Sequence, residues 1–139
     1  MLERDVIFSK ISIIKNCLKS IEKATGLDPE RLDDRFTQDV FVLNLQRAVQ
    51  ACVDMANTVI AMEGFKLPSS YKESFTILSQ NRIIDAEMEE EMKRMTGFRN
   101  IAVHNYQSLD IDILKSILRN KLPGLEGFYK TVYDHVMRK

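Results

Sequence analysis

Apolar residues recur at alternating spacings of four and three positions along most of this 139-residue chain. That spacing places them on one face of an α-helix, and this face must then be buried against neighbouring helices. No segment alternates apolar and polar residues with the period of two that marks a half-buried strand. The sequence therefore predicts an all-α fold, a compact antiparallel bundle with short connections. The clearest apolar stripe lies within residues 3–25 and consists of Ile7, Ile11, Ile14, Leu18 and Ile21.

Glycine, proline and capping residues divide the chain into about five to six predicted helices. The second of these spans about residues 37–63 and carries a wide apolar face around Val49 and Cys52. The whole chain, residues 1–139, is short enough to form one domain. The predicted boundaries are helix ends at Gly26 and Gly64, helix starts after Ser70 and Asp85, and a break at Pro123-Gly124.

The charge pattern limits how the protein could bind a polyanion. A formal net charge of zero argues against a broadly basic surface that holds nucleic acid without specificity. Local basic groups remain, and we expect a polyanion to contact the one near the C-terminus, which contains Arg119, Lys121, Lys130, Arg138 and Lys139. No apolar run approaches the ~18 residues of a membrane span, so we expect a cytoplasmic protein.

Cysteine and histidine are too few and too scattered to suggest a disulfide framework or a metal centre. Cys17 and Cys52 lie among aliphatic neighbours, which favours buried free thiols in a reducing compartment. With two cysteines and two distant histidines, the sequence does not support a metal site. We therefore expect neither a metal nor another cofactor.

The densest group of reactive side chains lies in residues 97–106, which hold Arg99, Asn100, His104 and Tyr106. In one uninterrupted helix, Arg99 and His104 would point about 140° apart, whereas Arg99 and Tyr106 would lie about 20° apart. Two alternatives could bring Arg99 and His104 to one target. Either the helix ends or distorts before His104, or a two-fold dimer places copies of the motif around a shared cleft.

These side chains suit phosphodiester chemistry without a metal. A histidine transfers protons near neutral pH, and a guanidinium holds a phosphate through two parallel hydrogen bonds. Attack of a ribose 2′-hydroxyl on the adjacent phosphate needs both proton transfer and phosphate binding, so RNA is the natural substrate. The alternative is that the arginine is a helix cap or a surface charge, because the same spacing often arises by chance. Asp54, within the apolar run of the second helix, is a candidate supporting residue, although a solvated or hydrogen-bonded aspartate is the plainer interpretation.

The segment Arg99-Asn100-Ile101-Ala102-Val103-His104-Asn105-Tyr106 resembles the Arg-x₄-His-x-Tyr motif of HepT-type toxins, which belong to the HEPN superfamily. Similarity extends through residues 45–56, 68–75 and 121–123, and so covers nearly the whole chain. The resemblance implies a helical bundle that dimerises, with Arg99 and His104 lining a cleft between subunits and acting as a metal-independent endoribonuclease. Asn100 occupies the polar position that follows the arginine in the family motif.

The resemblance also implies regulation within a toxin-antitoxin system. In some members of the family, a minimal nucleotidyltransferase (MNT) antitoxin transfers AMP from ATP onto the motif tyrosine, here Tyr106. The same antitoxin could join the toxin dimer in a larger hetero-oligomer. The rival hypothesis is a non-catalytic helical module whose motif binds a nucleotide or the partner enzyme.

Overall fold

The computed structural model describes residues 2–138, which form six α-helices and two short 3-10 helices. The described residues contain no strand, so the all-α prediction is confirmed. Within the same residues, no helix combines the length and the apolar character needed to cross a bilayer. The elements are α1 (Leu2–Thr25), η1 (Pro29–Asp33), α2 (Arg35–Glu63), α3 (Tyr71–Gln80), α4 (Ala86–His104), η2 (Tyr106–Ser108), α5 (Ile111–Asn120) and α6 (Leu122–Met137).

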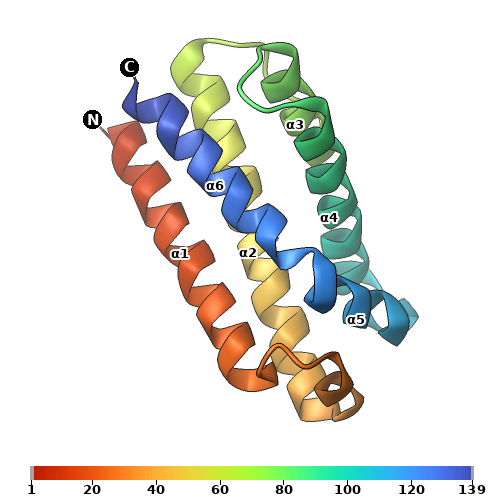
Figure 1. Cartoon of the computed structure of the whole chain (residues 1–139). Helices are drawn as coiled ribbons and strands as arrows, with labels where there is room; N and C mark the ends of the chain where they lie inside the picture. The colour runs from red at the N-terminus through yellow and green to blue at the C-terminus, as the bar shows by residue number, and fades with distance from the viewer. Residues whose placement is uncertain (1, 139) are drawn as a thin grey trace.

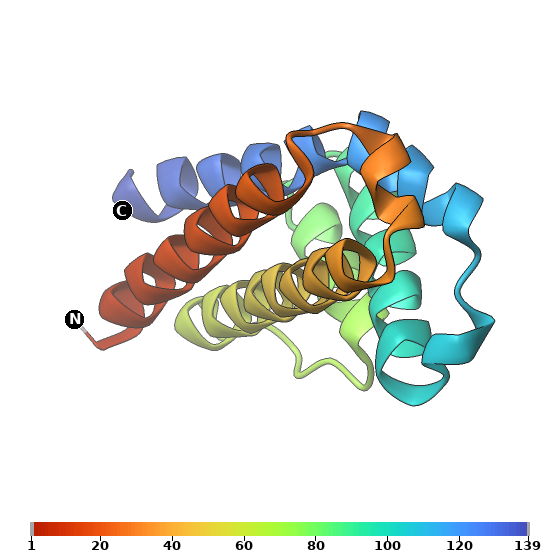
Figure 2. The same ribbon diagram turned by 90° about the horizontal axis from the view of Figure 1, so that it is seen from below.

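The two longest helices, α1 and α2, form an antiparallel pair, and α6 returns along them so that the two chain termini lie at the same end (Figure 1). A hydrogen bond from Arg4 Nη2 to the carbonyl oxygen of Val136, 3.2 Å long, links these ends. When the molecule is seen from below, α4 lies beside the group formed by α1, α2 and α6 (Figure 2). The short α5 packs against η1, where Lys115 Nζ lies 2.9 Å from Asp33 Oδ1.

The helix boundaries follow the predicted capping residues closely. Ser70 and Asp85 accept hydrogen bonds from the backbone N–H groups of Glu73 and Met88, as N-caps do. Gly64 ends α2 with a φ of 71°, a conformation that glycine adopts without steric penalty. The start of α2 is two residues earlier than the predicted residue 37, because Asp34 caps the helix by accepting from Thr37 N.

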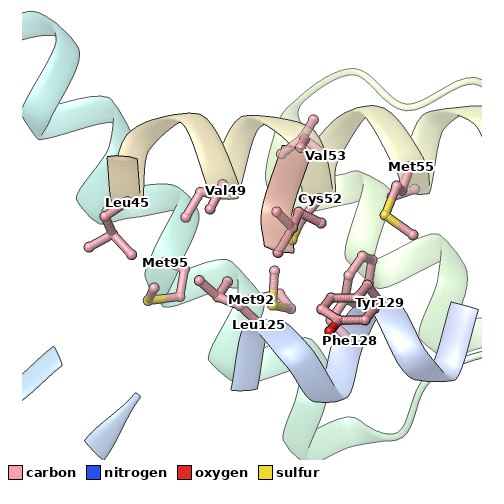
Figure 3. Packing of buried hydrophobic residues seen from close by; sticks show 14 of the residues in the cluster. Leu45, Val49, Cys52, Val53, Met55, Met92, Met95, Leu125, Phe128 and Tyr129 are labelled. Carbon is pink, nitrogen blue, oxygen red and sulfur yellow. The ribbon is translucent and has the colours of Figure 1, made fainter. Parts of the chain in front are cut away.

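One face of α2 supplies the centre of the hydrophobic core. Its buried side chains meet methionines from α4 and aromatic side chains from α6 (Figure 3). Phe75 of α3 and Phe128 of α6 add a T-shaped pair whose ring centroids lie 5.5 Å apart. Cys17 and Cys52 are both buried free thiols, as predicted, and burial raises the pKa of each.

The contribution of this face can be measured with a matched pair of leucines. Leu45 is fully buried under α4, whereas Leu67 is 77% exposed in the loop after α2. Leu45→Ala removes packed atoms and leaves a cavity, so we expect it to lower the free energy of unfolding by about 2–5 kcal/mol. Leu67→Ala should change it by less than about 0.5 kcal/mol. Urea unfolding followed by circular dichroism measures both; equal effects would contradict this description of the core.

Candidate active site

The motif arginine and histidine lie on one continuous helix. α4 extends to His104, and Asn105 N donates to the carbonyl oxygen of Ile101 at 2.8 Å, so the last turn keeps the α-helical pattern. The expectation that the helix could end or distort before His104 is therefore wrong. Arg99 and His104 diverge by about 140° around α4, and one chain does not direct them at a single atom. The other alternative drawn from the sequence, a site shared by two chains, stays a prediction.

Arg99 points toward the body of the protein. Its Nη1 donates to Asn100 Oδ1 at 3.1 Å, and its guanidinium carbon lies 5.3 Å from the centroid of the Tyr71 ring at the start of α3. This geometry is that of a cation–π contact. The Arg99 Nε atom is buried and has no hydrogen-bond partner among residues 2–138. Asn100 and Tyr71 thus fix the guanidinium while one of its donors stays unused.

A polar pocket of about 290 Å³ lies between α1, α2 and Arg99. Asp54 is half-buried in it, and its carboxylate contacts Lys10 Nζ at 3.2 Å and accepts from Gln50 Nε2 at 3.0 Å. The other amide atom, Gln50 Oε1, is buried without a hydrogen-bond partner in the described part of the chain. The pocket therefore contains residues with an unused donor and an unused acceptor. It is lined by Lys10, Ile13, Gln46, Arg47, Gln50, Ala51, Asp54 and Arg99.

His104 has a different environment. Its side chain is exposed at the end of α4, and within residues 2–138 the imidazole has no hydrogen bond or ion pair. Two apolar neighbours, Ile101 and Val103, are 46% and 40% exposed. The other histidine, His135, is held by Glu63 Oε1 at 3.0 Å. The His104 imidazole is thus open to an incoming group, with these two exposed apolar residues near it on the same helix.

Tyr106 lies beyond the helix end, on η2, and is attached to the beginning of α2. Its hydroxyl donates to Asp39 Oδ1, and the same carboxylate oxygen accepts from Arg35 Nε at 3.2 Å. The Arg35 guanidinium also lies 5.6 Å from the centroid of the Tyr106 ring. We call these three side chains, Arg35, Asp39 and Tyr106, the tyrosine cluster.

The tyrosine cluster changes the acidity of its two titratable members in opposite directions. Burial, and then the neighbouring Asp39 carboxylate, raise the pKa of Tyr106 from 10.0 to about 12, because both disfavour the phenolate anion. The hydrogen bond from Tyr106, helped by Arg35, lowers the pKa of Asp39. At neutral pH the pair therefore consists of a protonated phenol and an ionised carboxylate.

The structure separates residues that the sequence grouped together. Arg99 lies with Asn100 and Asp54, whereas Tyr106 contacts Asp39, about four turns and 22 Å earlier on α2 than Asp54. The cations beside Arg99 are Lys10 and Arg47, and the basic group near the C-terminus does not line this pocket. Lys139, which belongs to that group, is outside the described residues.

Sequence reasoning missed Tyr71, Lys10, Gln50, Arg35 and Asp39. Two weak local signals existed, because Arg35 with Asp39 and Gln50 with Asp54 have the i,i+4 spacing of helical neighbours. That spacing predicts contact within α2 and says nothing about which other element the pair will meet.

This all-α bundle has the fold of a class of protein, the HEPN toxins. The family described as ribonuclease HepT-like matches residues 14–132, and this chain belongs to that family. It is therefore a ribonuclease by family. The mRNA nuclease HepT of Shewanella oneidensis is 38% identical over 128 residues, covering 92% of this chain and 96% of the relative.

Solved structures show the same fold in related proteins. The tri-AMPylated Shewanella oneidensis HEPN toxin, in complex with MNT antitoxin, superposes with a TM-score of 0.88 at 38% identity. The match covers 94% of this chain and 98% of that one. A crystal structure of a toxin-antitoxin with AMP-PNP gives a TM-score of 0.89 at 37% identity, with the same coverage of both chains.

The tyrosine cluster can be tested by titrating the phenol. We expect the difference in ultraviolet absorbance between wild type and Tyr106→Phe to show that the Tyr106 phenol ionises near pH 12, because its pKa is raised to about 12. Asp39→Asn removes the carboxylate that opposes phenolate formation, so the same ionisation should move to lower pH, although burial, the larger cause, still raises the pKa. An unchanged titration in Asp39→Asn would contradict the contact between these two residues.

Proposed function

We propose that this protein is a metal-independent endoribonuclease toxin in which Arg99 and His104 act at a cleft between two copies of the chain. The observation that carries the proposal is the opposite placement of these residues on one regular helix. Arg99 faces a polar pocket with an unused donor, and His104 faces solvent with its imidazole unpartnered. One chain thus supplies the two halves of a site without assembling it. RNA as substrate and ATP as modifying reagent would place this activity in the cytoplasm.

The chemistry of such a cleft follows from the side chains. Arg99 binds the scissile phosphate and stabilises the charge that develops on it. A His104 imidazole takes the proton of the ribose 2′-hydroxyl as that oxygen attacks phosphorus. The bond to the 5′-oxygen then breaks, and this oxygen receives a proton, which the second copy of His104 can supply. The products are a 2′,3′-cyclic phosphate and a 5′-hydroxyl. Asn100 and Asp54 act as positioning residues around the guanidinium.

Exposed apolar surface next to the motif supports the proposed dimer. Ile101 and Val103 are 46% and 40% exposed although they flank the catalytic residues. A two-fold partner on this face would bury both side chains and bring a second copy of the motif opposite the first. Water would be excluded at the same time, which strengthens the interaction of Arg99 with phosphate.

We further propose that an MNT antitoxin controls this activity by transferring AMP to Tyr106. The support is the AMPylated state and the MNT antitoxin named for the Shewanella oneidensis toxin, together with the tyrosine two residues after His104. Each AMP would add a negative phosphate and a bulky nucleoside two residues after His104, the residue that must reach the RNA. Repulsion and obstruction would both lower RNA binding.

The alternative function is a nucleotide-binding module without catalysis. It is favoured by the pocket itself, because the unused Arg99 Nε donor and Gln50 Oε1 acceptor could hold a nucleotide that is never cleaved. Cleavage assays with mapped product ends separate this alternative from the nuclease.

The two histidines provide a matched test of catalysis. We expect His104→Ala to lower RNA cleavage by about 10²–10⁴-fold, the usual contribution of a proton-transferring residue. His135→Ala should cleave RNA at the wild-type rate, because His135 pairs with Glu63 on other helices. Both variants are assayed on total RNA in the presence of chelator, with circular dichroism as the folding control.

The product ends decide between the two functions. Fragments that carry 2′,3′-cyclic phosphates in chelator support metal-independent cleavage by this route. A fully active and fully toxic His104→Ala variant, or nucleotide binding without any cleavage, would contradict the nuclease proposal.

The modified residue can be identified with a pair of tyrosines. After incubation with the MNT partner and ATP, intact-mass measurement of wild type should show the addition of one or more AMP groups. We expect no addition on Tyr106→Phe and normal addition on Tyr133→Phe, since Tyr133 is an exposed tyrosine of α6 outside the motif. Equal labelling of Tyr106→Phe would move the acceptor to another residue.

A further inference from the structure

We propose that Asp39 is the base that accepts the Tyr106 proton when AMP is transferred to the tyrosine, so that the toxin contributes a catalytic residue to its own modification. This inference rests on the proposed role of Tyr106 as acceptor. It concerns a different element of the fold from the cleavage motif, because Asp39 lies in the first turns of α2.

The geometry places the base on the reacting oxygen before any partner arrives. Asp39 Oδ1 accepts the hydrogen bond from the Tyr106 hydroxyl, and this is the proton that must leave when the oxygen attacks phosphorus. The lone pairs of the phenol oxygen remain available to the incoming phosphate. Asp39 is exposed, so a proton taken from Tyr106 can pass on to water.

A base is needed because the phenol of Tyr106 does not ionise by itself near neutral pH. Burial and the adjacent carboxylate raise its pKa to about 12, which leaves almost no phenolate at neutral pH. The proton must therefore depart as the new bond forms. The carboxylate of Asp39 is ionised, since the hydrogen bonds from Tyr106 and Arg35 lower its pKa, and it already accepts the hydrogen bond of the phenol.

The step balances with ATP as the co-reactant. The Tyr106 oxygen forms a bond to the α-phosphorus while the bond from this phosphorus to the pyrophosphate oxygen breaks. The phenol proton moves to Asp39 Oδ1 and then to solvent, and pyrophosphate leaves. The partner nucleotidyltransferase binds and activates ATP.

Arg35 is a positioning residue in this scheme. Its Nε donates to Asp39 Oδ1 at 3.2 Å, and its guanidinium lies 5.6 Å from the centre of the Tyr106 ring. It thereby holds the carboxylate against the phenol from the same helical turn. After transfer, its positive charge remains beside the new phosphodiester, whose charge the Asp39 carboxylate would otherwise repel.

The test compares two substitutions of Asp39. Initial rates of AMP addition are measured by intact mass with Mg²⁺-ATP and saturating MNT partner, for wild type, Asp39→Asn and Asp39→Glu. Asparagine can still accept the hydrogen bond but cannot take the proton. We therefore expect the maximal rate of AMP addition to Asp39→Asn to fall by at least about tenfold, with little change in the KM for ATP. Glutamate restores a carboxylate, so Asp39→Glu should recover part of the rate.

The pH profile separates a base from a structural contact. Without the carboxylate, the reaction depends on spontaneous loss of the phenol proton, so the ratio of wild-type to Asp39→Asn rates should shrink as pH rises. The charged and titratable groups that face Asp39 are Arg35 on its own helix and Tyr106 on η2. Taking the ratio cancels the pH dependence of the partner enzyme.

Three results would overturn the inference. Asp39→Asn could be labelled as fast as wild type, or faster, which would make the carboxylate a restraint on Tyr106. Asp39→Asn and Asp39→Glu could be equally slow, with a ratio of wild-type to variant rates that does not change with pH. Asp39 would then hold Tyr106 in place without accepting its proton. Labelling of wild type at a residue other than Tyr106 would overturn the proposed acceptor as well, and peptide mapping distinguishes that outcome from the first two.

Discussion

The burial of one face of α2 against α1, α4 and α6 determines where the two polar clusters of this protein lie. Because Leu45, Val49 and Cys52 point into the core (Figure 3), the polar residues of the same helix are confined to its other side. This side brings Gln50 and Asp54 beside Arg99, and its first turns bring Asp39 beside Tyr106. The same packing that stabilises the bundle therefore assembles both polar clusters.

The two motif residues of α4, Arg99 and His104, lie on different sides of the helix. The side chains that anchor it, Met92, Met95 and Phe98, are buried, and Arg99 points along the same side of the helix into a polar pocket. His104 lies on the opposite side, next to exposed isoleucine and valine. In the proposed nuclease, each face of α4 would carry half of a site, and a second copy of the chain would supply the missing half of each. Two-fold symmetry would then bring Arg99 and His104 together without a kink in the helix.

The sequence predicted most of the fold, because helix periodicity and caps are local signals. Ser70, Asp85 and Gly64 marked the right boundaries, and the cysteines are buried free thiols as expected. The motif also drew attention to Arg99, His104 and Tyr106. The sequence could not predict that Tyr106 would bond to Asp39, since that contact joins residues far apart in the chain through the packing of η2 on α2. It also suggested C-terminal cations for polyanion binding, whereas Lys10 and Arg47 are the ones beside Arg99.

Tyr106 lies on a three-residue 3-10 helix after α4 ends, and this placement has a consequence for how the protein can evolve. The register that fixes Arg99 and His104 on α4 does not fix the tyrosine. If Arg99 and His104 cleave RNA and Tyr106 is the point of control, as proposed, the activity and its control can change independently. A substitution in the first turns of α2 could leave RNA cleavage intact and still remove the restraint on it. Such a variant would harm the cell that carries it. Natural selection therefore has a reason to preserve Arg35 and Asp39 even though neither lines the pocket that contains Arg99.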